Sequence, residues 1–295
     1  MPRGKRRRSG KTPVLGIVGA GRMGSWFAWF LTRRGHRVIV YDADPDRARE
    51  LAGKTGAAAA SGLGELAGGS DYIMIATPPW SVADVVGELA GYVVPGKLVF
   101  DIATFKTHVV DAYASLPEGV KAASAHPLFG PGAPLSDPGA FKVITIPIEG
   151  REGEGELRGF FSRLGFRVES MSWEEHDRVM ALTIGVSFAI GSLNNMLLLE
   201  RGLESLLEKS GSSFKALAIH ALSLLNQDER LIEYVLGLPL VREAVRDYAG
   251  RLVRLTEDPR KVVEELRKAR EEFGVEWLDA AYVSLYRAIE TFTLE

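Results

Sequence analysis

The chain has 295 residues, of which 46% are hydrophobic and 25% charged, a globular composition that can bury two moderate cores. Its 36 basic and 38 acidic residues give a formal net charge of −2, so the overall charge favours neither nucleic acid nor an anionic membrane as a partner. The absence of cysteine excludes disulfides, thiolate nucleophiles and cysteine-ligated metals; we assign no metal ligand and expect a cytoplasmic protein.

Residues 1–12 form a basic arm that contains glycine and serine but no apolar segment of the kind found in signal peptides. We expect a disordered, solvated tail there rather than a nucleic-acid-binding arm.

A glycine motif follows the first apolar run. Residues 14–18 are apolar, the chain continues as Gly19-x-Gly21-x-x-Gly24, and a helix-like segment comes next. Gly19 permits a tight turn, Gly21 lets a pyrophosphate approach the backbone, and Gly24 lets the helix lie close to the strand. Because a helix N-terminus also offers free N–H groups, we predict a dinucleotide site. We expect it to be formed by Gly19, Gly21, Arg22, Met23 and Gly24.

The second predicted strand, residues 37–42, ends in an acidic residue about 20 residues after the glycines. A carboxylate at Asp42 would accept hydrogen bonds from ribose hydroxyls and repel a 2′-phosphate, with Asp44 adding to the repulsion. We therefore predict NAD as the cofactor, while Arg47 and Arg49 leave NADP open.

Strands and helices alternate along the next hundred residues. A strand from Asp71 ends in a proline turn, where Thr77 and Pro78 are expected to contact the cofactor. Elsewhere we predict helices at 45–54, 81–91 and 152–164, strands at 97–101, 141–148 and 166–170, and a loose segment from 55 to 69. This alternation predicts an α/β, Rossmann-type doubly wound parallel sheet.

Two segments at strand ends are candidates for chemistry, because open α/β sheets bind ligands at the carboxyl ends of their strands. The first, 101–106, contains Thr104 and Lys106; the second, 124–132, is rich in proline and glycine and contains His126. Of the five histidines we assign His126 as the catalytic base, since imidazole can take a proton near neutral pH. His176 is open to two interpretations, a capping or interdomain hydrogen bond and a substrate contact.

From residue 172 onward the pattern is almost wholly helical, and Ser172-Trp173-Glu174-Glu175 resembles a capping box. We predict a dinucleotide-binding domain at 13–171 and a helical substrate and dimerisation domain at 172–295. Further helices are expected at 212–225, 228–236, 239–255, 259–272 and 275–291. The apolar stretch 180–199 is better explained by a core or a subunit interface than by a membrane, so we expect a homodimer.

Four motifs together resemble the prephenate dehydrogenase family: Gly19-x-Gly21-x-x-Gly24, Asp101-x-x-Thr104-x-Lys106, His126-Pro127-Leu128-Phe129-Gly130-Pro131 and His176-Asp177-Arg178-x-Met180. The resemblance covers roughly the first two thirds of the chain. It implies NAD(P)-dependent oxidative decarboxylation of prephenate to 4-hydroxyphenylpyruvate in tyrosine biosynthesis. His126 would take the hydroxyl proton, and Thr104 would orient the substrate where the family usually has serine. Lys106 would either anchor its loop or attract the dianionic substrate.

The sequence departs from the family at two positions. Ser187-Phe188 stands where a second histidine is usual, and no arginine occurs from 202 to 229 to bind a substrate carboxylate. A buried dianion needs compensating charge, which Lys215, Arg178, Arg230 or a second subunit could supply. We list Lys106, His176 and Lys215 as expected substrate contacts.

These departures keep two alternatives open. One is another two-domain NAD(P)-dependent dehydrogenase, acting on a β-hydroxy acid or an imine. Such enzymes generally use a lysine of the helical domain for proton transfer, whereas the best candidate here is His126. The other is a catalytically inactive protein that binds the dinucleotide and acts in regulation.

Overall fold

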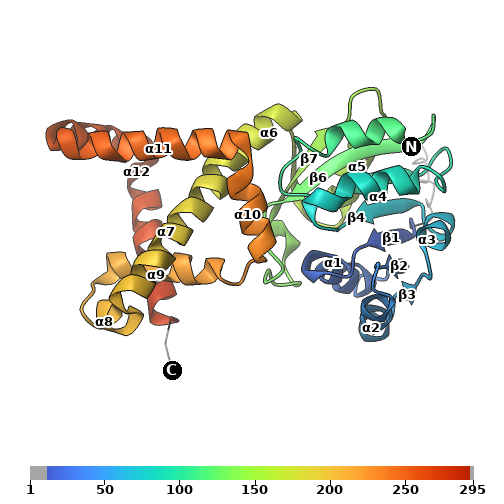
Figure 1. Ribbon diagram of the computed structural model, residues 1–295, viewed down its shortest axis with the longest axis horizontal. Helices are drawn as coiled ribbons and strands as arrows, with labels where there is room; N and C mark the ends of the chain where they lie inside the picture. Colours follow the sequence, from blue (N-terminus) through green and yellow to red (C-terminus); the bar gives the residue numbers. More distant parts are fainter. Residues whose placement is uncertain (1–11, 293–295) are drawn as a thin grey trace, which may run out of the picture. The chain divides into compact units, whose positions relative to one another are not determined.

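The computed structural model describes residues 12–292, so residues 1–11 of the expected basic tail lie outside the described residues (Figure 1). The chain divides into two compact units, the first ending at Asp177 and the second beginning at Arg178. The division falls inside a helix, α6 (Trp173–Met180), whereas the composition changes just ahead of that helix.

The first unit contains an eight-stranded sheet in the order β3-β2-β1-β4-β5-β6-β7-β8. All neighbouring strands are parallel except β6 and β7, so the predicted parallel sheet is observed with one antiparallel pair. The strands are β1 (Leu15–Val18), β2 (Val38–Tyr41), β3 (Ala58–Ala59), β4 (Tyr72–Ile75), β5 (Leu98–Asp101), β6 (Lys121–Pro127), β7 (Lys142–Pro147) and β8 (Arg167–Ser170). The central strands β1, β4 and β5 are buried along their whole length, as in sheets covered on both faces.

Helices cover both faces of this sheet (Figure 1). The core on one face contains side chains of α1 and α5, and the core on the other face contains side chains of α3 and α4. The helices are α1 (Arg22–Thr32), α2 (Pro45–Thr55), α3 (Leu63–Gly69), α4 (Val82–Leu89) and α5 (Glu154–Arg163). The arrangement is a Rossmann-type sandwich, in which α1 follows directly from the glycine turn after β1.

Several elements were not expected from the sequence, among them α3 and the full length of β6. The segment interpreted as loose contains α3, whose Leu63, Leu66 and Ala67 are buried at helical spacing despite the surrounding glycines. The segment around His126 was expected to be a loop, but β6 extends through it to Pro127. Its small residues have weak strand propensity, and β6 forms because it pairs with both β5 and β7.

The second unit is helical. Its helices are α7 (Val186–Arg201), α8 (Leu203–Glu208), α9 (Ser212–Leu224), α10 (Glu229–Gly237), α11 (Pro239–Glu257) and α12 (Pro259–Glu290). A π-helical turn at Ala181–Gly185 joins α6 to α7. The predicted break between two helices near residue 274 is observed as a kink in α12, where Gly274 has φ +75°.

The second unit buries few apolar side chains. Leu198, Ala218 and Ala221 form a small core between α7 and α9, while α12 has no buried residue. All but three of the large hydrophobic side chains that are exposed in the described residues belong to this unit. The helix Trp173–Arg201 is long and apolar enough, by length and composition alone, to cross a membrane, and 22% of its most apolar window is buried.

Candidate functional site

The three glycines of the motif have different structural roles. Gly19 has φ +106°, and a Cβ there would lie 2.8 Å from the carbonyl oxygen of Ala76. A Cβ on Gly24 would lie only 1.9 Å from the carbonyl oxygen of Gly19, so only glycine lets α1 approach this closely. A Cβ on Gly21 would meet no protein atom within 4 Å. The space in front of Gly21 is therefore open to a ligand.

The N-terminus of α1 fits a dinucleotide phosphate. Gly21 caps the helix without a side-chain hydrogen bond, and Arg22 and Met23 form the beginning of its first turn. Backbone N–H groups at such a terminus bind anions well. Beyond β4, the hydroxyl of Thr77 is buried without a hydrogen-bond partner in the structure, and Pro78 beside it is exposed. These are the positions where the sequence predicts contacts with a cofactor.

Asp42 follows β2 and supports the glycine turn. Its Oδ2 accepts a hydrogen bond from the backbone N–H of Ala20 at 2.7 Å, and its Oδ1 accepts one from Asp44 N–H at 2.9 Å. The side chain is only partly buried. Since each carboxylate oxygen can accept more than one hydrogen bond, Asp42 can hold the turn and still accept ribose hydroxyls.

Aromatic side chains connect α1 to the segment after His126. Phe129 stacks on Phe166 with ring centroids 5.7 Å apart and lies 4.8 Å from the Trp26 ring. The indole N–H of Trp26 donates to the carbonyl oxygen of Ala133 at 2.8 Å. The helix that begins at the glycine motif therefore fixes the path of the chain beyond His126.

His126 lies at the carboxyl end of β6, where it is opposite Ile144 of β7 and keeps 6% of its surface exposed. Its Nδ1 lies 2.9 Å from Nε2 of His176, and the two rings are nearly perpendicular. The hydrogen bond to His176 engages Nδ1, which leaves Nε2 available for a substrate.

Asp177 completes this set. Its Oδ1 lies 2.7 Å from Nδ1 of His176, and its carboxylate also accepts hydrogen bonds from the backbone N–H groups of Lys106 and Thr107 and from the Thr107 hydroxyl. The capping interaction predicted at the start of α6 is observed, because Glu175 N–H donates to the Ser172 hydroxyl. The first turns of α6 thus place His176 and Asp177 against the loop after β5.

Lys106 does not have the exposure that a substrate contact requires. It is completely buried, and its Nζ donates to Asp101 Oδ1 at 2.8 Å and to the carbonyl oxygen of Ala125 at 2.7 Å. Tyr113 donates from its hydroxyl to the other oxygen of Asp101 at 2.9 Å. This corrects the prediction of a substrate-binding lysine: Lys106 anchors its loop to the strand that carries His126.

Of the two interpretations left open for His176, the structure supports a hydrogen-bonding role and corrects the predicted substrate contact. His176 is also completely buried, and both of its ring nitrogens are engaged, by His126 and by Asp177. His176 therefore contacts the predicted base, His126, and has no ring nitrogen left for a substrate.

The remaining predicted residues lie in two places. Thr104 is half-buried on the loop whose Lys106 lies against β6. Lys215 is half-buried on α9 in the second unit and is not part of the His126 cluster described above. In that unit Ser187 Oγ lies 2.8 Å from His220 Nε2.

Burial and charge together set the pKa values of the cluster. Burial lowers the pKa of His126 well below its usual value, and the positive charge that His176 carries when protonated and the charge of Lys106 act in the same direction. Burial also lowers the pKa of His176, against the opposing hydrogen bond to Asp177. Burial alone would raise the pKa of Asp177, but hydrogen bonds from His176, Thr107 and the Lys106 amide lower it. The result is a neutral imidazole beside an ionised carboxylate, the state of a general base at rest.

Sequence reasoning did not assign roles to Asp101, Tyr113 and Asp177, although Asp101 and Asp177 lie within the motifs quoted above. A signal was available for Asp101, since an acidic residue that ends a buried strand is costly to bury without a cation or a donor. No local pattern connects Asp177 to residue 106, 71 positions earlier in the chain.

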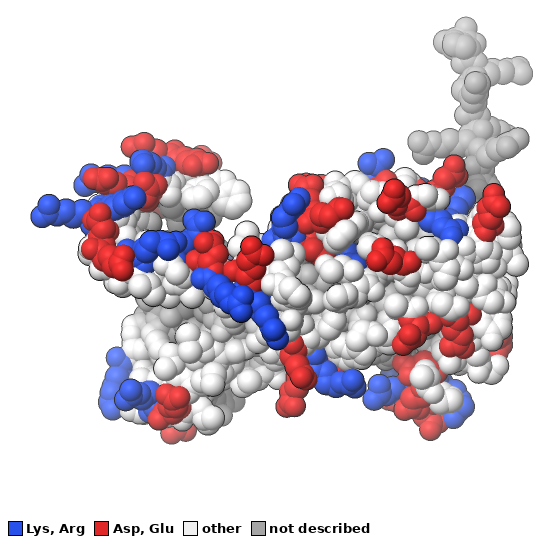
Figure 2. Space-filling view, turned by 45° about the horizontal axis from the view of Figure 1, so that its top comes forward, with Lys and Arg blue, Asp and Glu red and all other residues white. Residues whose placement is uncertain are grey.

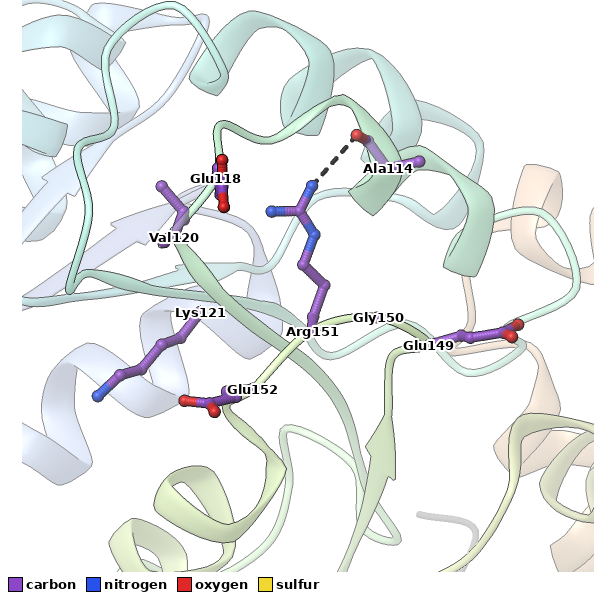
Figure 3. A pocket seen from close by; sticks show the side chains of 9 residues that line it. Ala114, Glu118, Val120, Lys121, Glu149, Gly150, Arg151 and Glu152 are labelled. Atoms are coloured by element: carbon purple, nitrogen blue, oxygen red, sulfur yellow. Dashed lines mark hydrogen bonds between the residues drawn. The ribbon is translucent and has the colours of Figure 1, made fainter.

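A separate pocket of about 600 Å³ lies at the opposite end of β6 from His126 (Figure 3). It is lined by Lys121, Arg151 and three glutamates, among other residues. The guanidinium of Arg151 donates to the carbonyl oxygens of Ala114, Leu116 and Pro117, so it holds the chain together at this edge rather than facing a ligand.

The chain is similar in sequence to parts of several nucleotide-dependent oxidoreductases. The family described as NADP oxidoreductase, coenzyme F420-dependent, matches residues 14–104. A probable arogenate/prephenate dehydrogenase of Methanocaldococcus jannaschii is 30% identical over 184 residues, covering 60% of this chain and 40% of that protein. A 4-amino-4-deoxyprephenate dehydrogenase of Streptomyces pristinaespiralis is 27% identical, covering 58% of this chain and 57% of that protein. The alignments therefore span about half the length of these curated relatives.

Solved structures share the fold over nearly the whole chain. A prephenate dehydrogenase from A. aeolicus, crystallised with hydroxyphenyl propionate and NAD⁺, matches with a TM-score of 0.71 and 20% identity, covering 95% of this chain and 100% of that one. An arogenate dehydrogenase from Synechocystis matches with a TM-score of 0.68 and 19% identity, covering 88% and 99%. The fold is thus a Rossmann-type unit followed by a helical unit, as in these dehydrogenases.

Proposed function

We propose that this protein is an NAD-dependent dehydrogenase of the prephenate type, which oxidises and decarboxylates prephenate to 4-hydroxyphenylpyruvate. The observation that carries the proposal is the buried His126, which is paired with His176 and Asp177 at the carboxyl end of β6, in the unit that also contains the glycine turn. The names of the two curated relatives and of the two solved structures support the same reaction class.

The cofactor would be held by the residues that the sequence assigns. Gly19, Gly21 and Gly24, with the N–H groups of Arg22 and Met23, would receive the pyrophosphate, and Thr77 and Pro78 would line the path beyond β4. Asp42 would accept the ribose hydroxyls, which favours NAD over NADP. When bound, NAD⁺ supplies the electron acceptor for the oxidation.

The side chains of this protein would transfer a proton and orient the substrate. Nε2 of His126 would accept the proton of the substrate hydroxyl, and the Thr104 hydroxyl would orient that group. Loss of the ring carboxylate as carbon dioxide then makes the ring aromatic. The low exposure of His126 keeps water away from the proton acceptor.

One assay tests the proposal. Purified protein is mixed with NAD⁺ and, separately, with prephenate, arogenate and 4-amino-4-deoxyprephenate, and cofactor reduction is followed by absorbance. We expect turnover with prephenate and a loss of about 10²–10⁴-fold in kcat for His126→Asn. NAD⁺ binding should be retained in that variant, because His126 is not among the residues assigned to the pyrophosphate or the ribose.

Turnover with an amino substrate but not with prephenate would redirect the substrate assignment. Intact NAD⁺ binding without reduction in the presence of any of the three substrates would favour a regulatory dinucleotide-binding protein instead.

We also propose a cytoplasmic homodimer formed through the second unit. Exposed apolar side chains such as Leu199, 87% exposed, and Trp277, 77% exposed, support the dimer. Figure 2 shows charges of both signs scattered over the face drawn there, with wide areas that carry none, and no field of one sign that would favour nucleic acid. Polar side chains of the apolar helix α7 also form hydrogen bonds with α9 of the same unit. Ser187 contacts His220, and Asn195 donates to the carbonyl oxygen of Ala221.

A further inference from the structure

We propose that Asp177 and His176 are positioning residues that hold His126 in the tautomer whose Nε2 has a free lone pair to accept the substrate proton. The inference rests on the proposed role of His126 as proton acceptor. It goes beyond that role because it states, for each ring nitrogen of His126 and His176, whether that nitrogen is protonated.

The carboxylate of Asp177 is buried, with 1% of the residue exposed. Two of its partners, the backbone N–H groups of Lys106 and Thr107, can only donate, with N···O distances of 2.8 to 3.0 Å. The carboxylate therefore acts as an acceptor at both oxygens. Several N–H donors also favour the ionised form of a buried carboxyl group. Two partners remain: the Thr107 hydroxyl, which donates to Oδ2, and Nδ1 of His176, which lies 2.7 Å from Oδ1 and must then carry a proton.

The proton on Nδ1 of His176 fixes the other nitrogen. A neutral imidazole carries one ring proton, so Nε2 of His176 presents a lone pair. That lone pair faces Nδ1 of His126 at 2.9 Å, and a hydrogen bond at this distance requires that Nδ1 of His126 carries the proton. Nε2 of neutral His126 is consequently unprotonated. A chain of obligate donors thus selects the tautomer that a general base needs.

The same contacts accommodate the proton once it arrives. Addition of one proton to Nε2 makes His126 an imidazolium with both nitrogens protonated. Its Nδ1 proton can then shift to Nε2 of His176, which moves the single positive charge onto the ring beside Asp177. The other charged groups that face the pair are Lys106, whose ammonium opposes a positive charge there, and Asp101, which pairs with Lys106. The Asp177 carboxylate is the group in hydrogen-bond contact that offsets the new charge.

Nitrogen NMR of the wild-type protein tests the assignment directly. The chain has five histidines, so long-range proton–nitrogen spectra can be assigned by the loss of signals in His126→Asn and His176→Asn. Above the pKa of both rings we expect Nδ1 of each ring to show the shift of a protonated nitrogen and Nε2 that of an unprotonated one. A His126 ring protonated at Nε2 would overturn the inference, whatever the activity of the protein.

A pair of substitutions tests the effect on catalysis. In Asp177→Asn the amide is no longer a charged acceptor, so the His126 tautomer should become mixed and kcat should fall by about 10²–10⁴-fold, with the KM for NAD⁺ little changed. The matched control is Glu175→Gln, which removes an exposed negative charge from the same helix and should leave both the spectrum and kcat as they are. Unaltered tautomers and kcat in Asp177→Asn would contradict the inference.

The two proposals fail separately. If Asp177→Asn does not fold, the wild-type spectrum still decides the tautomer. If the wild type shows the expected tautomers but reduces no NAD⁺ with any of the three substrates, the proposed function fails and the tautomer assignment stands.

Discussion

Individual side chains in the first unit show how burial changes the role of a charged residue. Lys106 has the sequence position of a substrate ligand, yet its ammonium is completely buried and bonded to Asp101 and Ala125. A buried charge must be paired, so the lysine and the aspartate require each other. The cation that would bind the substrate carboxylate must therefore be a group other than Lys106.

The pH dependence of turnover follows from the state of His126. Because burial, with His176 and Lys106, lowers its pKa well below 6.5, the imidazole stays neutral and able to accept a proton in mildly acidic solution. We expect the acid limb of the kcat/KM profile to lie at a lower pH than that of free imidazole, about 6.5. Initial rates at saturating NAD⁺ across the acid range measure it. A limb at or above pH 6.5 would contradict the environment described for His126.

Asp42 is expected to contribute to cofactor choice. Asp42→Ala removes both the ribose acceptor and the hydrogen bond to Ala20 N–H, so the Kd for NAD⁺ should rise by about tenfold or more, equivalent to about 1.4 kcal/mol. NADP⁺ should lose less affinity, because a repulsive charge is removed as well. Fluorescence titration with both nucleotides measures this. Asp46→Asn, an exposed position on α2, serves as the control, and an unchanged NAD⁺ affinity in Asp42→Ala would refute the role.

The helices and strands show where sequence patterns suffice and where they do not. The glycine turn, β2, β4 and β5 follow from apolar runs bounded by turn residues, and the helices of the second unit follow from their periodicity and from Pro239, Pro259 and Gly274 at their boundaries. The length of β6 could not be predicted in this way, because its alanines are ordered by neighbours on both sides rather than by their own propensity. The contact between Asp177 and the loop after β5 likewise depends on tertiary folding alone.

The contrast between Gly24 and Gly21 allows packing to be separated from binding. Gly24→Ala places a methyl group against the carbonyl oxygen of Gly19, so the free energy of unfolding should fall by about 1–3 kcal/mol. Gly21→Ala meets no protein atom and starts from φ −69°, which alanine adopts readily; its stability should change by less than about 1 kcal/mol.

NAD⁺ affinity should be lost in Gly21→Ala all the same, because the methyl group occupies the space where the pyrophosphate approaches. Denaturant unfolding and NAD⁺ titration of both variants measure the two effects. Tight NAD⁺ binding by Gly21→Ala would rule out this position for the pyrophosphate.

The two units of the chain differ in how they bury apolar surface. The first has a core on each face of its sheet, whereas the second leaves most of its large hydrophobic side chains exposed, including those of α12. Since helices in proteins gain most of their stability from packing an apolar face, the second unit as it stands lacks cover. A second copy of the chain is the simplest partner that supplies it.

Self-association is therefore expected at micromolar concentration, with dissociation in the double variant Leu199→Glu/Trp277→Glu, because both changes put charge on exposed apolar positions of the second unit. Sedimentation velocity measures the mass of the species. Val94→Glu, at an exposed apolar position of the first unit, should leave the dimer intact. A monomeric wild type would exclude the homodimer.

The position of α6 across the unit boundary determines where the first unit could be separated from the second. It begins in the first unit with His176 and Asp177 and crosses the unit boundary after Asp177. A chimera that joined this nucleotide-binding unit to another protein's helices at residue 172, where the composition changes, would exchange the partners of His126 along with the helices. Recombination at that point would keep the proposed cofactor site but would replace His176 and Asp177, the residues that position His126. The working length of the nucleotide-binding module is thus set by Asp177, several residues past the point where the sequence changes character.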